Sequence, residues 1–202
     1  MTETVSEVTT GDGVKIAVRR FADAAIDTAP RRDVLVLHGW PNSSRIWRIL
    51  AETLVRAAAP ATSLHIFAPD LRGFGDSDKP DSGYNCERFA QDVSDIAAGL
   101  NLRHYLLMGH SMGGKIAQIA AAKRPPELSA LVLLTPGLLA PSPPVDISER
   151  IASYGDDNKT RSMLAGWVAH RLSVADETML AEDGLRTGRG AWNGWLETMR
   201  GE

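Results

Sequence analysis

The hydrophobic positions of the chain form short unbroken runs, separated by stretches in which they recur every three or four residues. The unbroken runs are Val34–Leu37, Leu64–Ala68, Tyr105–Met108 and Ala130–Leu134. Runs of this kind predict strands that are buried on both faces, as in a parallel sheet. Ahead of them, Val5–Thr9 and Val14–Arg20 alternate in part around Gly11-Asp12-Gly13, which predicts a hairpin.

Helical spacing fills the intervals between the predicted strands. A helix that Ser43 or Ser44 can cap follows the first run. A second apolar stripe extends from Phe89 to Leu100, and an alanine-rich helix is expected over Lys115 to Lys123. Strands and helices that alternate in this way predict an α/β fold with a mostly parallel sheet and flanking helices.

The pattern changes at Pro136. The stretch PGLLAPSPPVD holds four prolines and is typical of a linker or loop. Strand-like runs stop there, and the rest has helical spacing, with a capping-box pattern at Ser173 and Asp176. We therefore predict two parts: a partial α/β core over residues 1–140 and a small helical cap or lid over residues 141–202.

Composition narrows the classes of partner. The 202 residues are 44% hydrophobic and 23% charged, which suits a globular protein with a real core. The net charge is −3 with both signs scattered, so we expect neither nucleic acid nor a membrane surface as a partner. No apolar run is long enough to span a bilayer, and the polar first residues do not resemble a signal peptide.

Cys86 is the single cysteine of the chain. An internal disulfide and a zinc site built on paired cysteines are therefore excluded, and we expect a cytoplasmic location and no metal or other cofactor.

The stretch LLMGHSMGGKIAQ, residues 106–118, carries the clearest chemical signal. A strand that ends in Gly-x-Ser-x-Gly and passes directly into a helix must turn sharply at the serine, here Ser111. Gly109 and Gly113 must be small because strand and helix nearly touch there. The turn would lift the Ser111 hydroxyl above the sheet edge, beside the first free amides of the helix. The next residue, Met112, can then donate its N–H to an oxyanion.

Two more motifs follow earlier strands: His38-Gly39-Trp40-Pro41, and the stretch from Asp70 to Pro80, DLRGFGDSDKP. Together with the serine motif they resemble, in order and spacing, the α/β-hydrolase fold family. The resemblance implies that Ser111 is a nucleophile that forms an acyl-enzyme, and that Trp40 and Met112 donate the two oxyanion amides.

The same resemblance implies supporting roles for the remaining motif residues. His38 would shape the oxyanion loop, Asp70 and Arg72 would be a charged pair that fixes a glycine-rich turn, and the His110 side chain would leave the turn away from Ser111.

In this family the order of catalytic residues is serine, acid, histidine, and the last two are not identifiable here. The sequence stops where the family would enter the strand that carries the acid, so we expect a C-terminally truncated core. The strand at Ala130–Leu134 would then be an exposed edge through which the chain could associate with itself. His170 is a weak candidate base, while His65 and His104 belong to the opposite end of the sheet. Asp146, Asp156, Asp157, Asp176 and Asp183 are expected to be helix caps or surface charges.

Two functions stay open. The first is a serine hydrolase that acts on a small-molecule substrate, an apolar ester or related acyl compound, with Trp167, Trp192 and Trp195 either lining an apolar pocket or simply packing the lid. Epoxide hydrolases and haloalkane dehalogenases resemble the Asp70–Pro80 stretch, but they need an aspartate in place of Ser111. The second function is a non-catalytic remnant or ligand-binding module. A phosphate or dinucleotide site is disfavoured, because Gly109–Gly114 lacks the lysine-serine ending of a phosphate-binding loop and the glycine spacing of a dinucleotide site.

Overall fold

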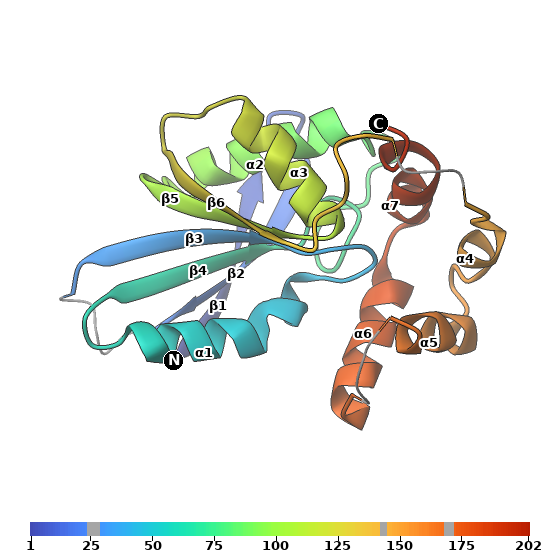
Figure 1. The fold of residues 1–202 in the computed structure, drawn as a ribbon, viewed down its shortest axis with the longest axis horizontal. Coiled ribbons are helices and arrows are strands. Elements are labelled where there is room, and N and C mark those ends of the chain that lie inside the picture. The colour runs from blue at the N-terminus through green and yellow to red at the C-terminus, as the bar shows by residue number, and fades with distance from the viewer. Residues whose placement is uncertain (24–28, 142–144, 168–171) are drawn as a thin grey trace.

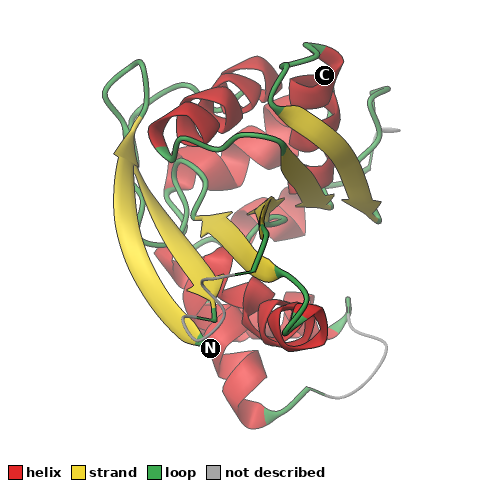
Figure 2. Ribbon diagram, turned by 90° about the vertical axis from the view of Figure 1, so that its left-hand side faces the viewer, coloured by secondary structure: helices red, strands yellow, loops and turns green. Residues whose placement is uncertain are grey.

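The computed structural model describes residues 1–23, 29–141, 145–167 and 172–202. Within these ranges one six-stranded sheet has the order β1-β2-β4-β3-β5-β6. The strands are β1 (Thr2–Thr9), β2 (Lys15–Ala22), β3 (Arg31–Leu37), β4 (Ser63–Pro69), β5 (Tyr105–His110) and β6 (Leu128–Leu134). β2 pairs antiparallel with β1 and with β4, whereas β4, β3, β5 and β6 run parallel. The predicted mostly parallel sheet is confirmed, with the long β1–β2 pair at one edge (Figure 2).

Helices cover both faces of the sheet (Figure 1). A 3-10 turn, η2 (Ser44–Trp47), leads into α1 (Arg48–Ala58) on one face, and α2 (Cys86–Gly99) and α3 (Met112–Ala122) lie on the other. Ser43 caps η2, where its side chain accepts the Arg45 N–H. The helix predicted to begin at Lys115 begins three residues earlier, directly after Ser111, because Met112 and the two glycines also adopt helical geometry.

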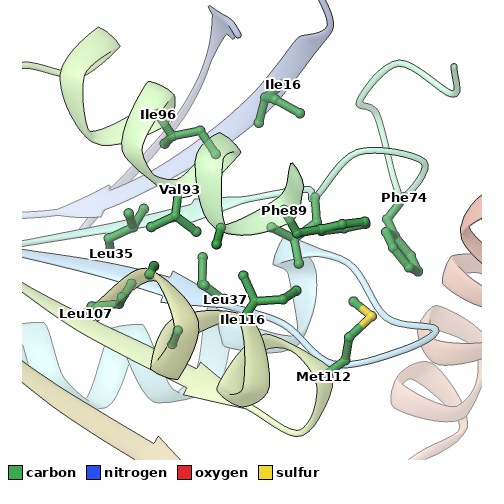
Figure 3. Packing of buried hydrophobic residues seen from close by; sticks show 14 of the residues in the cluster. Ile16, Leu35, Leu37, Phe74, Phe89, Val93, Ile96, Leu107, Met112 and Ile116 are labelled. Carbon is green, nitrogen blue, oxygen red and sulfur yellow. The ribbon is translucent and has the colours of Figure 1, made fainter. Parts of the chain in front are cut away.

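The residues of β3 alternate between the two faces. Val34 and Val36 belong to the apolar cluster under α1, whereas Leu35 and Leu37 belong to the larger cluster under α2 and α3 (Figure 3). All four are at most 7% exposed. Burying each such side chain stabilises the fold by about 1.5–3 kcal/mol, which is why this run contains no polar residue.

A helical segment, described over residues 145–167 and 172–202, follows the sheet. It contains α4 (Ser148–Ala152), α5 (Asp157–Ala165), α6 (Val174–Arg186), α7 (Arg189–Asn193) and a final π-helical turn, η3 (Gly194–Met199). Ser173 caps α6 by accepting the Asp176 N–H at 3.1 Å, and its hydroxyl donates to the Asp176 carboxylate at 2.6 Å, so the predicted helix start at these two residues is confirmed. The segment lies beside the edge where the parallel strands end (Figure 1). No helix of the described residues has both the length and the apolar character needed to cross a membrane.

β6 is the other edge of the sheet, and within the described residues it pairs only with β5. Leu134, Leu138 and Leu139, at the end of this strand and just beyond it, are 37%, 61% and 51% exposed. An unpaired apolar edge favours pairing with another chain. Self-association through β6 stays a prediction.

Candidate active site

Ser111 alone makes the turn between β5 and α3. Its backbone has φ 52° and ψ −118°, a conformation that residues with a side chain rarely adopt. Three hydrogen bonds hold it: the Ser111 N–H donates to the Leu134 carbonyl at 3.2 Å, and the Ser111 carbonyl accepts from the N–H groups of Lys115 and Gly137 at 3.1 and 2.8 Å. The surrounding structure therefore offsets the strain at this residue.

Glycines allow the close approach of the strand, the helix and the neighbouring loops. A Cβ atom on Gly109 would lie 2.7 Å from the Gly114 Cα, and one on Gly113 would lie 2.5 Å from the His38 carbonyl oxygen. A Cβ atom on Gly114 would lie 2.7 Å from the Pro136 Cβ. Each distance is shorter than van der Waals contact, so a side chain at any of these positions would force the turn apart.

The loop of residues 38–40 passes directly beside Ser111. A Cβ atom on Gly39 would lie 3.0 Å from the Ser111 Cβ and 3.1 Å from the His110 Nδ1. The Met112 side chain is fully buried in the core (Figure 3), which leaves its backbone N–H at the start of α3. Within the part of the chain that the structure describes, the N–H groups of Trp40 and Met112 donate no hydrogen bond to a protein acceptor. Two free donors therefore lie on the two segments next to the hydroxyl.

His38 is a fully buried structural histidine. Its Nε2 accepts the Leu71 N–H at 3.0 Å, so the proton is on Nδ1, which donates to the Gly39 carbonyl at 3.0 Å. Burial lowers the pKa of His38 below its ordinary value of 6.5, although the bond to Gly39 acts in the opposite direction. A neutral ring with both nitrogens occupied holds the loop in place and has no free nitrogen with which to accept a proton.

Asp70 and Arg72 both fix loops, but the expectation that they pair with each other is wrong. Asp70 accepts the backbone N–H groups of Ser44 and Asp76 at 2.6 and 2.8 Å. Arg72 instead forms two bonds to Asp92, at 2.5 and 2.6 Å, and further bonds to Asp12. Arg72 and Asp92 are both buried, so the guanidinium joins α2 to the loop after β4.

The other histidines that the structure describes make no contact that would take a proton from Ser111. No described histidine hydrogen-bonds the Ser111 hydroxyl, and His170 lies outside the described residues. His110 lies against Gly39 and lines the same cavity as Ser111, contrary to the expectation that it leaves the turn. Burial lowers the pKa of His110 below 6.5. His65 lies near the start of β4 and His104 directly precedes β5. Both are therefore at the opposite end of the sheet from Ser111, as predicted.

Asp183 is not the cap or surface charge that its context predicted. It is fully buried in α6 and accepts bonds from the Ser43 N–H, the Ser43 hydroxyl and the Arg45 guanidinium, the last at 2.5 Å. Asp183 therefore attaches the helical segment to the loop after β3. By contrast, Asp156 caps α5 through the Lys159 N–H, as expected.

A cavity of about 510 Å³ lies between the sheet edge and the helical segment and reaches Ser111. Its lining residues are Trp40, Asn42, Ile46, His110, Ser111, Thr135, Arg150, Leu164, Trp167, Leu180, Trp195 and Arg200. Sequence patterns missed Arg150, Arg200, Asn42 and Thr135, because no motif or spacing connects them to the serine. The described residues contain no cluster of three or more groups suited to a metal ion.

The tryptophans divide between packing and lining. Trp192 is fully buried, with its ring 4.6 Å from Trp40 and its Nε1–H donating to the Arg150 carbonyl at 2.9 Å. Trp167 and Trp195 line the cavity, and the Trp167 ring lies 5.7 Å from Trp40. Trp192 therefore packs the helical segment against the core, whereas Trp167 and Trp195 line the cavity, so each of the two expected roles is present.

Comparison with known proteins places the chain in a family. A family model described as alpha/beta hydrolase fold matches residues 34–193, so the chain belongs to the α/β-hydrolase fold family. A putative 2-succinyl-6-hydroxy-2,4-cyclohexadiene-1-carboxylate synthase of Bacillus subtilis is 35% identical over 90% of this chain and 65% of its own length. A soluble epoxide hydrolase of a Corynebacterium species is 37% identical over 42% of this chain and 27% of its own length. The chain therefore spans less than two thirds of the length of these relatives.

Solved structures agree on the fold. An esterase from Exiguobacterium antarcticum superposes with a TM-score of 0.78 at 22% identity, over 98% of this chain and 74% of that one. A bromoperoxidase from Bacillus anthracis gives the same TM-score at 17% identity, over 98% and 75%.

Proposed function

We propose that this chain carries the nucleophile of a serine-dependent hydrolase that acts on small, apolar ester or related acyl substrates. The observation that carries the proposal is the placement of Ser111: it makes a strained turn at the mouth of a cavity, beside the free N–H groups of Trp40 and Met112. A hydroxyl held beside two fixed amides is the arrangement that acyl transfer needs.

The chemistry follows from those positions. The Ser111 Oγ attacks the carbonyl carbon of the ester, and the carbonyl oxygen takes the electron pair and becomes an oxyanion. The N–H groups of Trp40 and Met112 would stabilise that charge. When the tetrahedral intermediate collapses, the bond to the alcohol breaks, the alcohol leaves with the proton that Ser111 gave up, and water later hydrolyses the acyl-enzyme. Losing one such donor typically costs about 10²–10³ in rate.

The residue at position 111 also separates this chemistry from that of some relatives. Ser111 stands where, by family resemblance, epoxide hydrolases and haloalkane dehalogenases carry an aspartate. The cavity wall supplies indole and aliphatic surface from Trp40, Trp167, Trp195 and Leu164, which favours an apolar or aromatic acyl group.

A reducing cytosol remains the expected compartment, because Cys86 is the single cysteine of the chain and is buried as a free thiol.

Turnover of p-nitrophenyl butyrate tests the proposal. Wild-type protein should release p-nitrophenol faster than buffer alone. In Ser111→Ala, the rate in excess of the buffer rate should fall at least about 10³-fold. Ser162→Ala, a substitution in α5 that leaves Ser111 intact, is the matched control and should keep the wild-type rate. Equal rates for wild-type protein and Ser111→Ala would contradict the proposal.

One observation favours a second function. Among the described residues no histidine or carboxylate hydrogen-bonds the Ser111 hydroxyl, and a serine without a base is a weak nucleophile. A ligand-binding module would keep the cavity and bind acyl compounds without turning them over. Binding of butyrate esters to a folded protein whose Ser111→Ala variant has the same low turnover would favour this alternative.

A further inference from the structure

Two arginines give the cavity a charge that the proposed apolar substrate alone does not explain. Arg150 comes from α4 and Arg200 from the turn that follows η3, and both line the cavity that reaches Ser111. Both residues are partly buried. Ordering two long cationic side chains at the wall of an apolar cavity is costly unless an anion compensates.

Neither arginine has a carboxylate partner within the described ranges. The ion pairs of those residues include neither Arg150 nor Arg200. No aspartate or glutamate is among the described residues that line the cavity. The wall therefore carries two positive charges, although the whole chain carries a net charge of −3.

Backbone hydrogen bonds place both residues at the wall, and the Arg150 side chain also has an indole neighbour there. The Arg150 carbonyl accepts the Trp192 indole N–H at 2.9 Å, and its guanidinium lies 5.8 Å from the centre of the Trp167 ring. The Arg200 N–H donates to the Trp195 carbonyl at 3.3 Å. Guanidinium groups present paired donors that match a carboxylate, and the indole face of Trp167 lies beside the Arg150 guanidinium.

We infer that the substrate of this site carries a carboxylate, which Arg150 and Arg200 bind while its apolar body lies against Trp40, Trp167 and Trp195. This inference deepens the proposed function and rests on it only for the reaction, because the binding preference exists with or without turnover. The substrate class is thus an acyl compound with a free carboxylate and an apolar or aromatic part.

Binding of a matched pair of probes tests the inference. 4-Phenylbutyrate and 4-phenylbutyramide share size and shape and differ in charge, and their affinities for the full chain are measured by titration calorimetry. The carboxylate should bind at least about tenfold more tightly than the amide, as expected for charge-assisted hydrogen bonds. The preference should shrink when the salt concentration rises from about 0.05 M to about 0.5 M.

Substitutions assign the preference to the two residues. Arg150→Met and Arg200→Met keep the apolar stem and remove the charge, and each should reduce the preference for the carboxylate at least about threefold. Lysine at either position should retain part of it. Arg56→Met is the control, because Arg56 is exposed on α1 and does not line the cavity; this variant should keep the full preference.

Equal affinity for the two probes, or a preference that survives both methionine substitutions, would overturn the inference. Labelling of Ser111 by a fluorophosphonate separates it from the proposed function. A labelled serine without carboxylate preference leaves the hydrolase proposal intact and ends the inference. A carboxylate preference without labelling supports the inference and contradicts the hydrolase proposal.

Discussion

The sheet and the helical segment share one apolar cluster, but they bury their residues in different patterns. In the sheet, successive apolar residues of β3 bury themselves on alternate faces under α1 and under α2 and α3. In the helical segment, α4 buries no residue and α5 buries only Thr160 and Leu164. Ala191, Trp192, Leu196 and Met199, from α7 and η3, are buried in the same large apolar cluster as Leu35 and Leu37. Asp183 adds a buried polar contact to the loop after β3. Periodic burial along each strand specifies the sheet, whereas the wall of the cavity is positioned by scattered apolar residues of α7 and η3 and by the buried contacts of Asp183.

Arg72→Met should produce the largest loss of stability, because it breaks the most buried charged contact of the sheet region. The variant leaves Asp92 buried with Arg88 as its remaining cationic partner. Removing one partner of a buried pair typically costs about 3–5 kcal/mol. Urea denaturation should show a loss of that size for Arg72→Met and less than about 0.5 kcal/mol for the exposed Arg56→Met. A loss below about 1 kcal/mol would contradict a buried ion pair between Arg72 and Asp92, because only exposed pairs contribute so little.

Asp183→Ala should act next most strongly, and on the helical segment more than on the sheet. The substitution removes the acceptor of the Ser43 hydroxyl and the buried acceptor of the Arg45 guanidinium, which keeps its bonds to Glu182 and to the Met179 carbonyl. The expected cost is about 2–3 kcal/mol. Hydrogen exchange should show lost protection in α6 and retained protection in β3 and β5. Glu182→Ala removes the neighbouring, half-exposed carboxylate that pairs with the same arginine, and it should cost less than about 1 kcal/mol. Uniform loss of protection in the Asp183→Ala protein would show that the two regions unfold as one.

Acidification should weaken the loop beside Ser111. Because burial lowers the pKa of His38 below 6.5, the unfolded chain takes up a proton below that pH that the folded chain does not. As the pH falls from about 6.5 to about 5.5, the free energy of unfolding should therefore decrease, and His38 contributes up to about 1.4 kcal/mol per pH unit to that decrease. Above about pH 7.5, His38 should have no effect on the free energy of unfolding. His38→Gln should reduce the slope and leave the part that the buried His110 contributes, and the exposed Arg56→Met should leave the slope unchanged. An unchanged slope in His38→Gln would place the titrating group elsewhere.

Arg186→Ala should have the smallest effect, although Arg186 also joins the two regions. Its ion pair with Asp76 has side chains 37% and 52% exposed. Exposed pairs of this kind contribute about 0–1 kcal/mol. Chemical denaturation should give a change within that range; a loss equal to that of Asp183→Ala would mean that the number of contacts across the boundary matters more than their burial.

The sequence predicts the sheet well because its signals are local and repeated. Apolar runs identified four parallel strands, and the glycines around Ser111 identified the position of the turn. Asp183 escaped prediction because its partners Ser43 and Arg45 lie about 140 residues away, and no local pattern records such a pairing. Arg150 and Arg200 escaped for the same reason: they reach the cavity through the path of the helical segment and not through a motif.

The attachment of a fluorophosphonate to the protein tests the central claim most directly, because it reports whether the hydroxyl at the turn is an activated nucleophile. Mass spectrometry of the digested, folded protein should locate a single adduct on the peptide that contains Ser111, and Ser111→Ala should remove it. Absence of any adduct on folded protein, or an adduct that persists in Ser111→Ala, would contradict the account.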